Sequence, residues 1–416
     1  MASYVVESCS VFLDNSVMKI LIVSLYYFPE DFPINHVAEN LVKRGHSVTV
    51  LTGKPSYGRG YIYPGYQNLS YELVNGVRVY RVNTRASKHS KLSIFRNAEM
   101  FVKNANRWVK ATKEKYDVVY TYGKGYSSVY EPGNLYKKIH HVPHIGHVID
   151  LSPEDQIASR LFFRYSPYSL INYLYSRHEY KKLDQVVFSS PSYKEYFDNV
   201  LLLKKVNSSY IPQPIYINEK SDDPYHYDDG FNILYKGEMN RIYQVDIIIE
   251  AMRKVGNEKV NFHIFGYGKY ASELVQRADE LGLGRRIIFH GDKPNKNMVN
   301  YYVNCDMVFV GYSRRYHYHF STPDSFIEAM AYEKPILAVM DGDSKNILQK
   351  CDGGVIAKEN IDDLVYAISK AASLKKTQLE KMGHNNYEYY NKYFNLNYVV
   401  TQIESVLLEK SLQKLI

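Results

Sequence analysis

The chain contains few cysteines, and none of them is spaced for a metal site or a redox pair. The three copies, Cys9, Cys305 and Cys351, lie far apart. Structural zinc sites and dithiol centres need closely spaced cysteines, so the sequence indicates neither and fits a reducing compartment. Internal repeats and low-complexity tracts are also missing. The composition, 45% hydrophobic and 23% charged, is that of an ordinary globular protein.

Long apolar runs are absent as well, so no segment is expected to span a bilayer. Residues 1–17 contain no Lys or Arg and only short apolar runs. They therefore lack the basic start and the apolar core of a signal peptide, and we treat them as a leader of uncertain role. We expect the protein in the cytoplasm.

Short apolar runs alternate with amphipathic segments along the whole chain, which predicts parallel α/β sheets. The strands are expected at residues 20–25, 48–51, 77–82, 118–122, 145–149, 186–189, 233–236, 262–265, 287–290, 307–310, 336–339 and 355–356. Helices are expected between them, for instance at residues 245–254 and 271–281. A chain of 416 residues is long enough for two such cores.

The segment Ile-Pro-Gln-Pro at residues 211–214 reads as a stiff linker between two doubly wound domains. We expect an N-terminal domain at 18–210 and a C-terminal domain at 211–394, with a helix at 395–416 that packs back. In open parallel sheets, ligands bind at the carboxyl ends of the strands. A cleft facing those ends is the expected site.

Residues 321–337, STPDSFIEAMAYEKPIL, combine a helix start with an acidic side chain. Thr322 is a suitable N-cap and Pro323 fits the first helical position. The following amide groups would then suit a phosphate, and Glu328, more than one turn further on, can accept bonds from sugar hydroxyls. The alternative is an ordinary capped helix that packs on a sheet with Glu328 in solvent.

Three strands of the second half run directly into glycine-containing loops. These loops begin at Gly237, Gly266 and Gly291. Glycine at a strand end allows the backbone to approach a ligand closely. One such loop is weak support for a site, whereas three on one sheet edge, followed by the helix with Glu328, favour a nucleotide-sugar site.

The order and spacing of several segments resemble the retaining GT-B glycosyltransferases of the large bacterial family 4, especially the branch that builds surface polysaccharides. The resemblance runs from Lys19 to about Phe394. Its segments are KILIVSLYYFPEDFPINHVAENLVKRGHSVTVLTG, DLSPED, LDQVVFSS, YKGEMNRIYQVDIIIEAM, FHIFGYGK, IIFHGDKP, CDMVFVGY and PDSFIEAMAYEKPILA.

The resemblance implies two Rossmann-like domains and transfer of a sugar from a nucleotide diphosphate donor, expected to be a uridine diphosphate sugar, with retention at the anomeric carbon. It implies no metal or other cofactor, so protein groups must stabilise the leaving diphosphate. Glu328 would bind the ribose, and amides around Asp324 the phosphates. The donor-binding candidates are Glu328, Arg241, Gly237, Gly266, Gly291, Asp292, Lys293, Thr322, Asp324, Ser325 and Phe326.

The catalytic candidates lie in the N-terminal domain. Asp150 ends a strand there, and we expect it to meet the acceptor or the reacting sugar, with Glu154 behind it. His147 is either a cleft residue near Asp150 or a plain structural histidine. The loop at residues 27–35 would line the other side of the diphosphate.

The sequence departs from the family pattern at one carboxylate position and at positions where positive charge is usual. Phe320 stands where the family has the first Glu of its Glu-x7-Glu motif. Glu238, Tyr243 and Gln244 fill the usual Gly-Arg and Lys-Gly positions, and Ser325 stands where one branch has a Lys. Arg241, or Arg314 and Arg315, would have to replace the missing cation.

Two groups of histidines are candidate metal ligands. They are His140, His141, His144 and His147, and the pair His317 and His319. In a strand, His141 and His147 would point one way and His140 and His144 the other, so a tetrahedral zinc site is not favoured. No metal is expected.

The segment 88–113 carries seven Lys or Arg residues. At helical spacing Arg96, Lys103, Arg107 and Lys110 form one stripe opposite an apolar one, a pattern that suits an anionic membrane surface or simply a solvated helix face. Nucleic acid is not favoured, because no aromatic-studded basic strand accompanies the stripe.

The leading hypothesis is a glycosyltransferase that extends a lipid-linked (polyprenyl-linked) or growing saccharide at the inner face of the membrane, for capsule or O-antigen. The alternatives are a catalytically impaired GT-B protein that binds another transferase and, more remotely, a nucleotide-sugar epimerase.

Overall fold

The computed structural model describes residues 17–57, 60–86, 91–158, 163–217, 221–294, 297–313 and 322–413. It divides into two compact units. The first contains residues 1–188, 194–211 and 400–416, and the second contains residues 189–193 and 212–399. The predicted boundary at residue 211 lies within one residue of this division. The predicted leader falls almost wholly outside the described residues.

The first unit is built on a sheet with eight described strands in the order β3-β4-β2-β1-β5-β6-β7-β8. All neighbours are parallel except the β3–β4 pair. The strands are β1 (Lys19–Val23), β2 (Ser47–Thr52), β3 (Tyr71–Val74), β4 (Val77–Arg81), β5 (Val118–Gly123), β6 (His144–Val148), β7 (Gln185–Phe188) and β8 (Ser208–Tyr210). The central strands read as continuous apolar runs because both of their faces are covered by helices.

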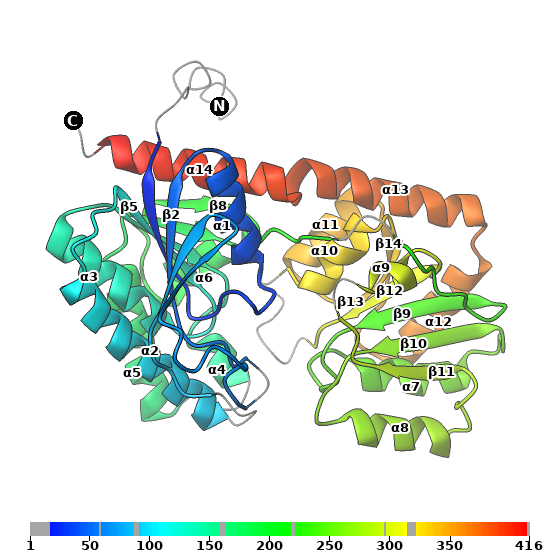
Figure 1. Ribbon diagram of the computed structural model, residues 1–416. Coiled ribbons are helices and arrows are strands. Elements are labelled where there is room, and N and C mark those ends of the chain that lie inside the picture. Colours follow the sequence, from blue (N-terminus) through cyan, green and yellow to red (C-terminus); the bar gives the residue numbers. More distant parts are fainter. Residues whose placement is uncertain are drawn as a thin grey trace. The chain divides into compact units, whose positions relative to one another are not determined.

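Helices cover both faces of this sheet, with α2, α3 and α5 together on one side and α1 and α14 on the other (Figure 1). The helices are α1 (Pro33–Lys43), α2 (Lys91–Ala111), η1 (Ser127–Tyr130), α3 (Glu131–His140), α4 (Glu154–Ala158), α5 (Pro167–Tyr180), α6 (Tyr193–Asn199) and α14 (Leu396–Gln413). Gly45, with a φ of 95°, follows the carboxyl end of α1.

The second unit holds a parallel sheet with six described strands in the order β11-β10-β9-β12-β13-β14. The strands are β9 (Phe231–Lys236), β10 (Val260–Phe265), β11 (Ile287–Gly291), β12 (Met307–Gly311), β13 (Ile336–Val339) and β14 (Gly354–Ile356). Side chains alternate between its two cores: Ile233 and Tyr235 join one cluster while Leu234 joins the other.

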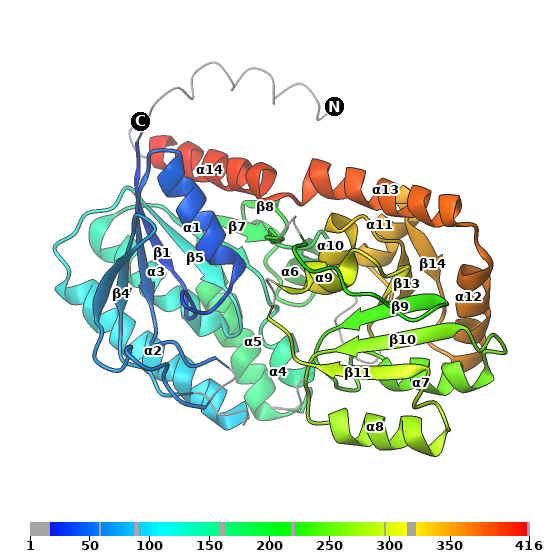
Figure 2. The same ribbon diagram turned by 45° about the vertical axis from the view of Figure 1, so that its right-hand side comes forward.

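The helices of the second unit fall on either side of its sheet, with α7, α8 and α12 on one face and α10, α11 and α13 on the other (Figure 2). They are α7 (Val245–Lys254), α8 (Ala271–Glu280), α9 (Val299–Tyr302), α10 (Asp324–Ala331), α11 (Asp343–Cys351), α12 (Ile361–Ser373) and α13 (Lys376–Tyr393). The predicted fold class of two doubly wound α/β units is therefore confirmed. Within the described part of the chain, no helix has the length and apolar character needed to cross a bilayer.

Candidate functional site

The second sheet has a topological switch point between β9 and β12. From β9 the chain winds outward through β10 and β11, and then returns to β12 on the other side of β9. Loops that leave such neighbouring strands diverge, which opens space at their carboxyl ends. Lys236 ends β9, and the chain after β12 leads to α10, so both elements contribute side chains to this point.

Glu328 of α10 is held at the switch point by two side chains. Lys236 Nζ lies 2.6 Å from Glu328 Oε1 and 2.8 Å from Oε2. The hydroxyl of Tyr302 donates to Oε2 at 3.1 Å. Burial, and secondly the charge of Glu328, raise the pKa of the Tyr302 phenol well above its usual range, so this hydroxyl stays a donor. Glu328 is thus not the solvated carboxylate of the alternative interpretation.

Lys236 is a functional candidate that the sequence analysis missed. Its side chain is 19% exposed and that of Glu328 is 13% exposed, so the pair is shielded but still reachable. The sequence did contain a pattern that could have indicated this role: a lysine ends an otherwise apolar strand immediately before Gly237. The pattern alone did not distinguish it from an ordinary surface lysine at a strand end.

The start of α10 differs by one residue from the prediction. The N-cap is Pro323 rather than Thr322, and no side chain caps the helix. The reason is that the amides of Phe326 and Ile327 both donate to the Pro323 carbonyl, at 3.0 and 3.3 Å. The Phe326 amide, predicted to meet a phosphate, is therefore already engaged. The carboxylate of Asp324, in the first turn, accepts a bond from Gln213 Nε2 at 2.7 Å.

The glycines at the strand ends serve two different purposes. Gly266 has a φ of 135°, and a Cβ there would lie 2.0 Å from the Gly237 carbonyl oxygen. A Cβ at Gly237 would lie 2.6 Å from the Tyr235 hydroxyl. These two glycines allow neighbouring loops to pack on each other. At Gly291, in contrast, a Cβ would meet nothing within 4 Å, so open space lies beside this position.

Two predicted donor-binding cations lie on the loops around this edge. Arg241 is exposed, 3.3 Å from Glu273 and stacked 5.1 Å from the Tyr270 ring. It therefore has partners of its own, and its donor contact stays a prediction. Asp292 and Lys293 follow Gly291 at the surface. Burial, and secondly the nearby charge of Lys293, lower the pKa of the adjacent His290 to about 4.

The predicted catalytic carboxylates lie after β6 in the first unit. Asp150 is half-buried, and its Oδ2 accepts a bond from the Gly125 amide at 2.9 Å. Glu154 is buried and accepts bonds from Arg164 Nη2 at 2.8 Å and from the Tyr173 hydroxyl at 2.6 Å. For the neighbouring half-buried Asp155, burial, and secondly the charge of Asp150, raise the pKa of the carboxyl well above the usual range. Of the three, Glu154 is buried, whereas Asp150 and Asp155 are half-buried.

His147 has the contacts of a structural histidine. Its ring is buried, Nδ1 lies 2.6 Å from the Tyr120 hydroxyl, and Nε2 lies 3.0 Å from the Ile211 carbonyl oxygen. Burial lowers the pKa of His147 to about 3, so the ring stays neutral. Both nitrogens are occupied, which favours the structural alternative over the role of a cleft residue.

The first histidine group does not form a ligand set. His140 stacks on Tyr136, whereas His144 bonds to Thr121 and Asn134. Among the described residues, no group of three His, Cys, Asp or Glu side chains could hold a metal ion. His317, His319, Phe320, Arg314 and Arg315 lie outside the described residues.

Two family models match the chain in the order of its two units. Residues 34–212 match the "Glycosyl transferase 4-like domain", and residues 217–389 match "Glycosyl transferases group 1". The chain is a glycosyltransferase. A curated relative, an uncharacterized glycosyltransferase of Methanocaldococcus jannaschii, is 23% identical over 86% of this chain and 89% of its own length.

Solved structures with the GT-B fold match this glycosyltransferase over nearly its whole length. Sucrose-phosphate synthase of Thermosynechococcus elongatus is 17% identical, with a TM-score of 0.73 and coverage of 94% of this chain and 98% of the other. Anabaena HepE, in complex with UDP and glucose, is 16% identical with a TM-score of 0.66, covering 94% and 100%. WaaG, involved in lipopolysaccharide biosynthesis, is 13% identical with a TM-score of 0.66, covering 94% and 99%.

Proposed function

We propose that this glycosyltransferase transfers a sugar from a UDP-sugar, with retention and without a metal ion, to a lipid-linked or growing saccharide of a bacterial surface polysaccharide. The observation that carries the proposal is the cluster of Lys236, Tyr302 and Glu328 at the switch point of the second sheet. HepE, whose structure holds UDP, and WaaG, which acts in lipopolysaccharide biosynthesis, share the fold and support this donor and this acceptor class.

In this proposal Glu328 accepts hydrogen bonds from the ribose hydroxyls. A carboxylate has about four lone-pair sites, and Lys236 and Tyr302 leave room for the sugar. The ammonium of Lys236 has three N–H donors. It supplies the positive charge that the family places at the positions of Glu238 and Tyr243, and it offsets charge on the leaving diphosphate. Such preorganised donors contribute a few kcal/mol to transition-state stabilisation.

The remaining roles follow the predicted assignments. Gly291, Asp292 and Lys293 meet the base, and the amides of Asp324 and Ser325 meet the phosphates. Asp150 contacts the acceptor or the reacting sugar. The protein acts at the cytoplasmic face of the membrane, where its basic side chains contact anionic lipid.

Titration calorimetry tests the donor. We expect UDP and at least one UDP-sugar to bind equally well with and without EDTA, and uridine to bind at least tenfold more weakly because it lacks the phosphates. Absence of any binding would refute the proposal. Transfer to a saccharide acceptor, with the product's anomeric configuration read by NMR, then tests retention.

A second candidate, a catalytically impaired protein that binds another transferase, is favoured by the negative charge at the start of α10. Asp324 lies in the first helical turn, where a phosphate would bind, and a carboxylate there repels an anion. Donor binding without hydrolysis or transfer, together with stable co-purification of a second enzyme, would support this candidate.

A further inference from the structure

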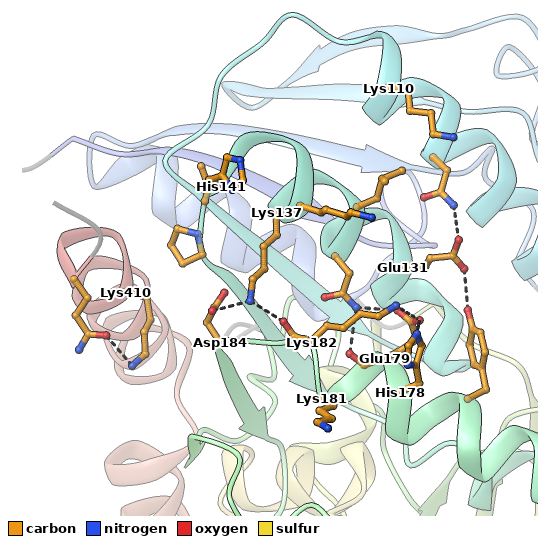
Figure 3. A pocket seen from close by; sticks show the side chains of 18 residues that line it. Lys110, Glu131, Lys137, His141, His178, Glu179, Lys181, Lys182, Asp184 and Lys410 are labelled. Carbon is orange, nitrogen blue, oxygen red and sulfur yellow. Dashed lines mark hydrogen bonds and ion pairs between the residues drawn. The ribbon is translucent and has the colours of Figure 1, made fainter. Parts of the chain in front are cut away.

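A basic pocket lies at the opposite end of the first sheet from the Asp150 loop. It has a volume of ≈ 1370 Å³ and is bounded by the residues before β6 and β7, by α3, by the carboxyl-terminal parts of α2 and α5, and by Lys410 and Gln413 of α14. Figure 3 shows lysines from several elements around it. Since the catalytic candidates follow the carboxyl end of β6, this pocket is a separate site.

The charge of the pocket is strongly positive. Six lysines and three carboxylates line it, a formal excess of three positive charges. Each carboxylate already accepts bonds from protein groups: Glu131 from Asn106 and Tyr175, Glu179 from Asn134 and Lys182, and Asp184 from Lys137 and the His144 amide.

Several of the lysines have no such bond. Among the described residues, the side chains of Lys110, Lys138 and Lys181 have no hydrogen-bond or ion-pair partner. Their charges are therefore available to an external anion.

The pocket continues into the basic stripe of α2. Arg96, Lys103, Arg107 and Lys110 are all exposed, whereas Phe101 and Ala105 on the opposite side are buried. This confirms the amphipathic pattern predicted for the segment. Lys110 belongs to both features, so the stripe and the pocket form one basic surface along the α2, α3 and α5 layer.

The neighbouring α5 exposes large apolar side chains beside this basic surface. Tyr168, Leu170, Ile171 and Leu174 are 57–68% exposed, and Phe163 and Tyr165 just before the helix are 87% and 95% exposed. At helical spacing Tyr168, Ile171 and Leu174 are followed along the same stripe by His178 and Lys181. One helix face is therefore apolar at its start and basic at its end.

We propose that this surface, the basic pocket with the exposed face of α5, docks the first unit on an anionic lipid bilayer. The lysines bind phosphate headgroups, while the apolar side chains of α5 enter the interface between headgroups and acyl chains. The proposal names the surface behind the membrane contact in the proposed function. A bilayer is favoured as the occupant because it offers anionic and apolar groups side by side over a broad area.

Flotation of the full chain with lipid vesicles tests the proposal. We expect binding to vesicles of phosphatidylcholine with added phosphatidylglycerol, weak binding to phosphatidylcholine alone, and weakening by salt. The double variant K138Q/K181Q should lower the partition coefficient about tenfold or more, since each basic residue near such a surface contributes about fivefold. The double variant I171S/L174S should lower it by a similar factor.

Matched controls lie elsewhere in the same unit. Lys43→Gln on α1 and Leu73→Ser on β3 change exposed residues outside this surface and should bind vesicles like the parent chain. All variants should bind UDP in solution as the parent chain does. Failure of UDP binding would count against the proposed function, whereas failure of vesicle binding alone would overturn the docking surface.

Two further outcomes would overturn the docking proposal. One is binding that is equal for neutral and anionic vesicles and unchanged in both double variants. The other is a concentration-dependent dimer that I171S/L174S abolishes while vesicle binding persists, because the α5 face would then be an interface between copies of the chain.

Discussion

The Lys236–Glu328 pair is the single contact on which the proposed chemistry depends most. A shielded ion pair adds little to the free energy of unfolding, because the cost of desolvating both charges offsets much of their attraction. Such a pair is suited to a binding site, where the ligand interacts with both charged groups. The bonds from Lys236 and Tyr302 fix the Glu328 carboxylate, so little side-chain entropy is lost when ribose binds.

Lys236→Met should weaken UDP binding about tenfold or more, because it removes a charge-assisted bond and leaves Glu328 without its cation. Lys236→Arg should restore part of the affinity. If Lys236 contacts the diphosphate, kcat falls along with the affinity. Calorimetry and initial rates measure both effects.

The control for this variant is Lys254→Met, since Lys254 is exposed and pairs with Asp362 away from the switch point. Arg241→Gln serves as the comparison between candidate cations. A larger loss of UDP affinity in Arg241→Gln than in Lys236→Met would contradict the role given to Lys236.

Glu30 gives the first unit a distinctive pH dependence. Its buried carboxylate accepts bonds from the amides of Ser56 and Tyr57. Burial nevertheless raises the pKa of Glu30 from 4.5 to about 7. The folded state thus holds a proton at pH values where the unfolded chain has released it. The stabilisation is complete below pH 4.5 and is lost as the pH rises through 7.

Glu30→Gln should remove this dependence. The difference in free energy of unfolding between variant and parent should change by about 3 kcal/mol between pH 4.5 and 7.5, at about 1.4 kcal/mol for each pKa unit. Urea unfolding followed by Trp108, the only tryptophan of the chain, reports on this unit. Glu195→Gln, at an exposed position, should leave the profile unchanged, and an unchanged profile in Glu30→Gln would contradict the assignment.

At the scale of elements, helix α14 is an integral part of the first unit although it lies at the other end of the chain. Its residues Ile403 and Leu407 are buried. Glu404 accepts bonds from Arg44 Nη1 at 2.5 Å and from His46 Nε2 at 2.8 Å. The predicted packing of the C-terminal helix on the N-terminal part of the chain thus has named contacts in the structure.

Leu407→Ala should lower the free energy of unfolding of the first unit by about 2–5 kcal/mol, since it creates a cavity at a fully buried site. Trp108 fluorescence in urea would register the loss although Trp108 belongs to α2. Glu409→Ala, at an exposed position of the same helix, should change the midpoint little. Equal midpoints for both variants would show that α14 is dispensable for this core.

Strands differed in how well the sequence predicted them. Central strands such as β1 and β12 were found to within two residues because their buried runs are continuous. The strands β3 and β8 were not predicted. Both lie at the edges of the sheet, and their side chains are mostly exposed or half-buried, so no apolar run marks them.

At the scale of the whole molecule, the two units have separate hydrophobic cores, and the proposed donor contacts lie in the second. A ligand that binds only the folded second unit stabilises it by RT ln(1 + [L]/Kd). At a hundredfold excess over Kd this amounts to about 2.7 kcal/mol.

UDP should therefore raise the unfolding transition of the second unit in calorimetry more than it raises the transition reported by Trp108. Uridine, which lacks the diphosphate, is the matched control and should have a smaller effect. A shift confined to the Trp108 signal would contradict the placement of the donor site in the second unit.

The amino-acid sequence by itself determined the two-unit α/β architecture, because buried parallel strands and amphipathic helices leave strong periodic signals. The sequence also singled out α10 with Glu328 as the donor-binding element, because glycine-containing loops follow the neighbouring strands. The tertiary structure alone decided which cation accompanies Glu328, since Lys236 is 92 residues away along the chain. It likewise joined the α2 stripe, the lysine pocket and the α5 apolar face. Contacts between distant residues depend on strand order and register, which local sequence patterns do not encode.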